Sequence, residues 1–180
     1  STYRYLNVRE PDGSLVSREK YDSDADKLSA YWYHSDGLGS VVALSDSSGT
    51  VTDRYSYDAW GNATHTYGST SDNPYQYVGR YGYYTHYQEP TLDLLQLGVR
   101  YYDPEVGRFT SRDPAKRGLN KYEYVNAGPL GRVDPFGLDW ITWDFVYHYF
   151  YGFAHTVDLA TVGLLDDYQR ASSVHVESFY

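Results

Sequence analysis

Turn sequences recur through the first 138 residues at intervals of about eight to twelve residues, and this spacing is the strongest constraint on the fold. The segments DGLG (36–39), DSSG (46–49) and DAWGN (58–62) each follow a short run rich in Tyr, Val or Thr. Asp caps turn backbones and Gly adopts positive φ without cost, so these words mark chain reversals. No apolar period of helical length occurs before residue 139. The pattern predicts a mainly β fold, an antiparallel meander of hairpins.

The composition supports strands and narrows the chemistry. The chain has 23 Tyr and 4 Trp, and Tyr suits strands because its ring stacks across neighbours while its hydroxyl stays hydrated. The absence of Cys excludes disulfides and thiolate metal sites, and the six His show no ligand spacing. We therefore expect no metal and no cofactor. The net charge of −9 argues against a nucleic-acid partner, which requires a basic face.

One acidic segment has part of a calcium-binding pattern. Asp22, Asp24 and Asp26 have the spacing that begins an EF-hand loop. Lys27 and Tyr33 then occupy the positions that require Gly and a bidentate Glu. The segment is better interpreted as a solvated acidic loop.

Two Asp residues, Asp113 and Asp134, are each followed by Pro. Proline biases the preceding residue toward extended geometry, which leaves each carboxylate free to face a partner. Two carboxylates brought together by a hairpin can share a proton, as in an aspartic-protease dyad. Among the nearby cations, Arg100 and Arg108 flank Asp103 and are candidates to pair with it.

Five short sequence motifs occur in a fixed order between residues 30 and 138. They are YHSDGLGS (33–40), YSYDAWGN (55–62), YYDPEVGRF (101–109), NKYEYV (120–125) and DPFGL (134–138). Together they resemble the core domain of the bacterial RHS, or YD-repeat, family, whose members build large β-shells. The resemblance divides the chain into an N-terminal YD-like hairpin (1–30), an RHS repeat-associated core (31–138) and a variable tail (139–180).

The same resemblance implies a self-processing site, since many family members cut their own chain after the second Asp-Pro motif. The matching catalytic residues are Asp113 and Asp134, with Arg112 orienting one carboxylate and the cut following Leu138. This chain departs from the pattern twice: Lys116 stands where the first motif has Gly, and the separation of the two Asp residues, 134 − 113 = 21, is slightly short. From these departures we predict a vestigial autoprotease whose bond stays intact.

The tail changes in character after Leu138. Aromatic residues recur at three- and four-residue steps, which predicts a short helix over 139–154 with one aromatic face. Acidic and His residues interrupt the segment, so a transmembrane span is not expected. We expect the aromatic face to dock on a core or on another copy of the chain, because soluble proteins rarely leave such a patch exposed. Its predicted anchors are Trp140, Trp143, Tyr147 and Phe150.

Two functions fit these features. The first is a secreted structural module that polymerises, as a filament or surface layer, through open sheet edges and the aromatic tail. The alternative is the C-terminal plug of a toxin-enclosing RHS shell that cuts itself after Leu138. The tail of 180 − 138 = 42 residues is small for a catalytic domain, which favours the first. Both imply an extracellular or cell-surface location in bacteria, and the first implies a homo-oligomer or polymer.

Overall fold

The computed structural model describes residues 3–11, 13–68, 72–86, 89, 92–115 and 119–142, all within one unit, Ser1–Trp143. These residues form antiparallel strands and two short 3-10 turns, η1 (Gly79–Tyr81) and η2 (Val125–Ala127). The predicted mainly β, antiparallel fold is confirmed. In this described part of the chain, no helix is long and apolar enough to cross a membrane, and no group of three His, Cys, Asp or Glu side chains could hold a metal ion.

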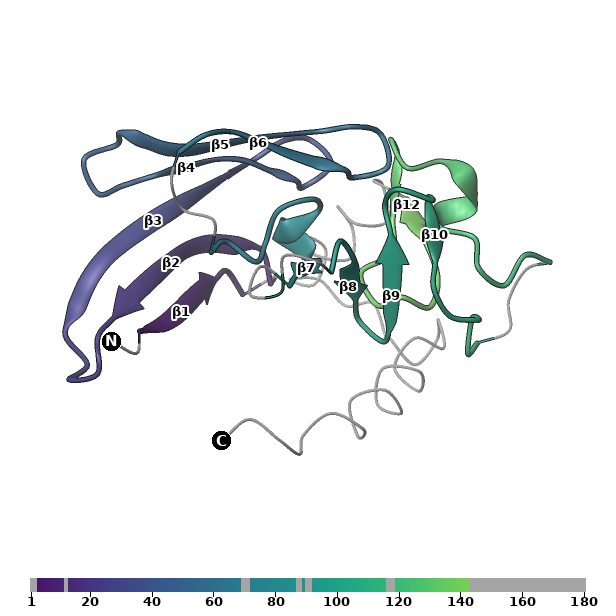
Figure 1. The fold of residues 1–180 in the computed structure, drawn as a ribbon, viewed down its shortest axis with the longest axis horizontal. Helices are drawn as coiled ribbons and strands as arrows, with labels where there is room; N and C mark the ends of the chain where they lie inside the picture. Colours follow the sequence, from purple (N-terminus) through teal and green to yellow (C-terminus); the bar gives the residue numbers. More distant parts are fainter. Residues whose placement is uncertain are drawn as a thin grey trace. The chain divides into compact units, whose positions relative to one another are not determined.

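Six strands in sequence order form the first sheet (Figure 1). They are β1 (Arg4–Arg9), β2 (Leu15–Tyr21), β3 (Lys27–Ser35), β4 (Val41–Ser45), β5 (Val51–Tyr57) and β6 (Ala63–Tyr67). Each pairs antiparallel with the next, as the turn spacing predicts, so β1 and β6 are the edges. Every residue of β6 is exposed.

The predicted turn chemistry explains this regular order. Asp36, Asp46 and Asp58 each accept backbone N–H bonds at Oδ1 from the residues two and four positions later, at 2.8–3.0 Å. The Gly that closes each turn has a positive φ of 83–97°. Asp22 caps its own loop in the same way, accepting from Asp24 and Asp26. A carboxylate cap therefore sets each of these reversals locally, with a glycine in the first three and Ala25, at a φ of 66°, in the loop of Asp22.

Residues from strands β2 to β5 build the core of the first sheet. Leu15, Tyr33, Val41, Leu44 and Tyr55 form a buried cluster, with Tyr57 and Tyr75 packed against it. A strand presents successive side chains to opposite faces, so the residues between these remain more exposed.

A second, smaller sheet carries the chemistry described below. Its strands are β7 (Tyr84–Thr85), β8 (Leu95–Leu97), β9 (Arg100–Asp103) and β10 (Arg108–Phe109), in the order β10-β9-β8-β7. Tyr102 lies in its core, 4.2 Å from Tyr124 and 6.0 Å from Phe109 between ring centroids. Tilted and edge-on aromatic pairs of this kind add packing energy beyond their buried area.

The third sheet replaces the start of the predicted tail helix. β11 (Arg132–Val133) pairs antiparallel with β12 (Ile141–Thr142), so one ladder of two residue pairs closes the segment 134–140, which contains the turn 134–138. The prediction of a helix is therefore wrong for Ile141 and Thr142, because their backbone groups pair with β11 instead of with the next turn. Asp139 and Trp140 are not helical either. The rest of that prediction, residues 143–154, lies outside the described residues, as do the interface anchors Trp143, Tyr147 and Phe150.

Candidate active site

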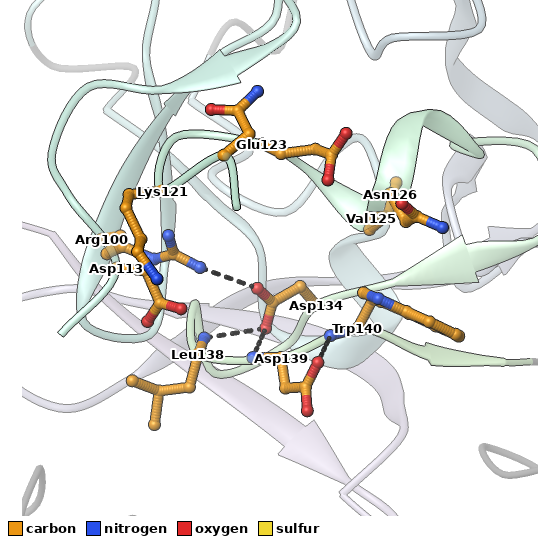
Figure 2. Close-up of a pocket in the computed structure, with 11 residues that line it drawn as sticks. Arg100, Asp113, Lys121, Glu123, Val125, Asn126, Asp134, Leu138, Asp139 and Trp140 are labelled. Carbon is orange, nitrogen blue, oxygen red and sulfur yellow. Dashed lines mark hydrogen bonds and ion pairs between the residues drawn. The ribbon is translucent and has the colours of Figure 1, made fainter. Parts of the chain in front are cut away.

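A polar cavity of about 150 Å³ lies between the turn 134–138, the start of β9 and the segment 120–126 (Figure 2). Both predicted carboxylates, Asp113 and Asp134, line it, and so do both residues of the predicted scissile bond, Leu138 and Asp139. The remaining lining residues are Arg100, Asn120, Lys121, Glu123, Val125, Asn126 and Trp140. The fold thus brings together the two Asp-Pro motifs and the bond after the second motif.

Asp134 is the centre of this site. Its Oδ1 accepts the backbone N–H of Leu138 at 3.0 Å and that of Asp139 at 3.2 Å, while Oδ2 pairs with Nη2 of Arg100 at 3.3 Å. Its own backbone N–H donates to the hydroxyl of Tyr83 at 2.7 Å. Figure 2 shows the carboxylate between the guanidinium on one side and the two amides on the other. One carboxylate oxygen therefore touches the nitrogen of the predicted scissile bond.

Burial changes the acidity of this carboxyl. Asp134 is 2% exposed, and desolvation raises its pKa from 3.8 to about 7. The amide of Leu138, the charge of Arg100 and the amide of Asp139 oppose the rise but do not cancel it. A carboxyl with a pKa near neutrality is about half protonated at pH 7, so it can act as a proton donor.

Arg100 connects the parts of the site. It is the first residue of β9, it is 5% exposed, and its guanidinium carbon lies 3.5 Å from the centre of the Phe109 ring. Its Nε donates to the carbonyl of Gly137. The sequence suggested that Arg100 pairs with Asp103. Instead it pairs with Asp134, and Asp103 caps its own turn by accepting the N–H groups of two following residues.

Two glycines let the turn 134–138 approach the β8–β9 turn. At Gly98, a Cβ would lie 2.3 Å from the Phe136 carbonyl oxygen, and at Gly137 it would lie 2.2 Å from that of Leu97. Both glycines have positive φ, 49° and 63°. The N–H of Val99 donates to the Phe136 carbonyl at 3.1 Å. Backbone packing of this closeness fixes the chain on the N-terminal side of Leu138.

The first Asp-Pro motif supplies the second carboxylate. Asp113 is 8% exposed; its Oδ1 accepts the N–H of Ala115 at 2.8 Å, and its own N–H donates to the Lys121 carbonyl at 2.8 Å. Arg112, the predicted orienting residue, is exposed and is not among the residues that line the cavity. Lys116 lies outside the described residues. The separation of 21 residues does not prevent both carboxylates from lining one cavity.

A strained turn that the sequence did not reveal forms another wall. Val125, Asn126 and Ala127 have consecutive φ values of 45°, 51° and 53°. Arg132 donates to the carbonyls of Val125 and Asn126, both at 3.4 Å, and its guanidinium lies 4.3 Å from the ring centre of Trp140. A run of non-glycine residues in this region costs energy and is held by surrounding contacts. Trp140 is 38% exposed.

These features define a class of protein. It is a module of YD-type β-hairpins in which a buried aspartate contacts the backbone of its own chain. The chain belongs to the teneurin YD-shell family, whose model matches residues 24–148. The predicted resemblance to RHS, or YD-repeat, proteins is confirmed.

Three similar chains carry this module as a small part of their own length. The tRNA3(Ser)-specific nuclease WapA of Bacillus spizizenii is 43% identical over 115 residues, which is 59% of this chain and 5% of that protein. The toxin subunit YenC2 of Yersinia entomophaga is 30% identical over 142 residues, 74% of this chain and 13% of that protein. The crystal structure titled TcdB2-TccC3-TEV matches 76% of this chain and 6% of that chain, with a TM-score of 0.61 and 26% identity.

Proposed function

We propose that this chain is the C-terminal plug of a toxin-associated YD shell, and that it hydrolyses its own Leu138–Asp139 bond. The names of similar proteins support the first part, since they include a toxin subunit and the toxin protein Tse5 of Pseudomonas aeruginosa. On this proposal the chain's natural partners are the earlier strands of its own longer protein. An extracellular route of delivery is part of the same proposal.

One observation carries the second part. Oδ1 of Asp134 accepts the backbone N–H of Asp139 at 3.2 Å, so the proposed acid already contacts the leaving nitrogen, to which it would give its proton once the attack has made the Leu138 carbon tetrahedral. Asp113 lines the same cavity, so a second carboxylate is available. General acid–base catalysis requires this proximity before any matching of pKa values.

The reaction gives one role to each carboxyl. Asp113 is the base, and it accepts a proton from a water molecule whose oxygen attacks the carbonyl carbon of Leu138. Asp134, as the protonated acid, gives its proton to the nitrogen of Asp139, and the C–N bond breaks. The products are a carboxylic acid at Leu138, which carries the hydroxyl of the water, and an amino group at Asp139. The single proton of the pair has then moved from Asp134 to Asp113. A dyad works in this way when its two environments hold one carboxyl protonated and the other ionised.

This proposal opposes the sequence-based prediction of an intact bond. That prediction rested on the spacing of 21 residues and on Lys116. Both carboxylates line one cavity, so the short spacing does not keep them apart. Lys116 lies outside the described residues, so its effect is decided by experiment.

The test follows the mass of the purified full chain over several days at pH 5, 7 and 9. We expect loss of the 42-residue tail (180 − 138) at pH 5 and 7, and at least a 100-fold slower reaction for Asp134→Asn and Asp113→Asn. Asp46→Asn is the matched control, because Asp46 also caps a turn through Oδ1 but lies on the first sheet. A wild-type chain that keeps its full mass at every pH would overturn the proposal and support the vestigial site.

Self-assembly through sheet edges is the second candidate function. The observation that favours it is the exposed edge strand β6, together with the other edge, β1. Such edges recruit strands unless they are covered. Size-exclusion chromatography separates the two: polymers whose size rises with concentration favour self-assembly, whereas a particle of constant size favours the plug. Trp143→Ala with Phe150→Ala then tests whether the predicted aromatic anchors hold any polymer together.

A further inference from the structure

We infer that the paired hydroxyls of Tyr83 and Tyr124 set the separation of the two carboxylates in the proposed dyad. The inference rests on the proposed function. Neither tyrosine belongs to an Asp-Pro motif, and neither is among the residues that line the cavity. Both are therefore positioning residues, which act on the reaction through the backbone that carries Asp113 and Asp134.

The first support is the contact of Tyr83 with the second motif. The backbone N–H of Asp134 donates to the Tyr83 hydroxyl oxygen at 2.7 Å, and both residues are buried. A buried backbone N–H requires an acceptor, and the hydroxyl supplies it. This contact fixes the backbone from which the Asp134 carboxylate projects.

The second support is the contact of Tyr83 with the wall of the cavity. The hydroxyl oxygens of Tyr83 and Tyr124 lie 2.9 Å apart. Tyr124 is buried and belongs to the segment 120–126, which forms that wall. Its ring centre lies 4.2 Å from that of Tyr102 in the core of the second sheet. The hydroxyl pair therefore joins the backbone of Asp134 to a wall that packing holds in place.

The third support is that the same segment holds the first motif. The backbone N–H of Asp113 donates to the Lys121 carbonyl at 2.8 Å, and Lys121 is three residues before Tyr124. A continuous series of contacts therefore runs from Asp113 through residues 121–124 and the two hydroxyls to Asp134. This series explains how both carboxylates line one cavity although the two motifs are only 21 residues apart (134 − 113).

The contact between the hydroxyls persists across the pH range of the cleavage assay. Burial raises the pKa of Tyr83 well above its usual value, and the charge of Asp134 adds to this rise. Burial likewise raises the pKa of Tyr124 well above its usual value. Both hydroxyls therefore remain neutral between pH 5 and 9, and each can still donate or accept a hydrogen bond.

The experiment measures the rate of tail loss for full-length Tyr83→Phe, Tyr124→Phe and the double variant. We expect each single variant to react at least about 10-fold more slowly, because misplacing a reacting group by about 1 Å can cost about 100-fold. Tyr124→Phe is the sharper test, since it leaves the acceptor of the Asp134 N–H in place and removes only the link to the wall. The double variant should react no more slowly than the slower single variant, because the two hydroxyls act as one unit.

Tyr102→Phe is the matched control. Tyr102 is buried in the same aromatic cluster, and its hydroxyl also bonds a backbone group, the carbonyl of Trp60 at 2.8 Å. That contact lies outside the series that joins the two carboxylates. The control should therefore be cut at the wild-type rate.

The pH dependence of the rate is the second readout. Burial is the largest cause of the raised pKa of Asp134. A displaced wall admits water to this carboxyl, so the alkaline midpoint should move to lower pH in both single variants and stay in place in Tyr102→Phe. The other charged groups that line the cavity are the same in every variant: Arg100, Asp113, Lys121, Glu123 and Asp139.

Circular dichroism and thermal unfolding establish which variants are folded. If Tyr83→Phe does not fold, Tyr124→Phe carries the test, and wild-type kinetics in that variant would overturn the inference. If neither single variant folds, the pair serves the stability of the fold and the inference is wrong. A slower variant that keeps the wild-type alkaline midpoint also contradicts it, because a merely structural role lowers the rate without moving the titration.

The wild-type chain separates this inference from the proposed function. If the wild-type chain is not cut, the proposed function and the inference fail together. If it is cut and both tyrosine variants react like Tyr102→Phe, the inference alone fails. A double variant slowed by the product of the two single effects would also show that the hydroxyls do not act as a pair.

Discussion

The contribution of Asp134 to the stability of the folded chain should fall as the pH rises from 4 to 8, because burial makes this carboxyl resist ionisation. Its pKa is raised from 3.8 to about 7 by burial, so the folded state binds this proton more tightly than the unfolded state does. Below pH 4 both states are protonated and no penalty arises. As the pH passes 4 the unfolded state loses its proton first, and the penalty is complete only above pH 7.

The magnitude follows from the difference in pKa, 7 − 3.8 = 3.2. At about 1.4 kcal/mol per pKa unit, ionising Asp134 in the folded chain costs roughly 4 kcal/mol. This is a large fraction of the roughly 5–15 kcal/mol that stabilises a typical domain. The cost already includes the favourable charge of Arg100, whose effect on Asp134 is smaller than that of burial.

The assay is urea unfolding between pH 4 and 8 on two chains that both carry Asp113→Asn, which we expect to prevent cleavage. One chain keeps Asp134 and the other carries Asp134→Asn. The substitution alters the contact with Arg100 equally at every pH. The way in which the difference in unfolding free energy between the two chains varies with pH therefore reports the titration of Asp134. We expect the difference in unfolding free energy to shift by about 4 kcal/mol in favour of Asp134→Asn between pH 4 and 8. Parallel curves would refute the raised pKa and, with it, the role of Asp134 as an acid at neutral pH.

Two further predictions concern backbone geometry. Gly137→Ala should destabilise the chain by at least about 2 kcal/mol in urea unfolding, because its φ is 63° and the new Cβ would meet the Leu97 carbonyl oxygen at 2.2 Å; Gly131→Ala, where a Cβ meets nothing within 4 Å, should change little. Ala127→Gly should stabilise the chain by roughly 0.5–1 kcal/mol, because it relieves a φ of 53°, whereas Ala63→Gly in β6 should destabilise it. A loss of stability in Ala127→Gly would show that the left-handed turn is not strained.

The contrast between Asp134 and the hairpin aspartates explains how a turn residue can become an acid. Asp46 and Asp134 both cap a following turn by accepting backbone N–H groups at Oδ1. The side chain of Ser48 and backbone amides hold the pKa of Asp46 below its usual value at the surface. Asp134 makes the same kind of contacts, but desolvation outweighs them. The backbone contacts are of the same kind, and burial is the largest cause of the opposite pKa shift at Asp134.

Much of the fold could be predicted from the sequence because the interactions that form its hairpins join residues close together in the chain. Three hairpins of the first sheet each depend on a carboxylate cap and a glycine within five residues, and sequential pairing follows from short connections. The same kind of local reasoning gave a wrong prediction, a helix, at Ile141. An aromatic period predicts a helix only when no partner strand is available, and β11 supplies one across the turn.

The sequence by itself determined the antiparallel hairpins, the motifs of the RHS, or YD-repeat, family and the two carboxylates of the candidate site. Only the tertiary structure decided how acidic Asp134 is, since its pKa depends on burial by strands distant in the chain. It also decided that Arg100, 34 residues before Asp134 in the sequence, is the arginine that pairs with it, while Arg112 is exposed. A motif fixes which groups are present and how they cap their own turns. Desolvation and long-range ion pairs arise from the packing of the whole module, so no spacing in the sequence encodes them.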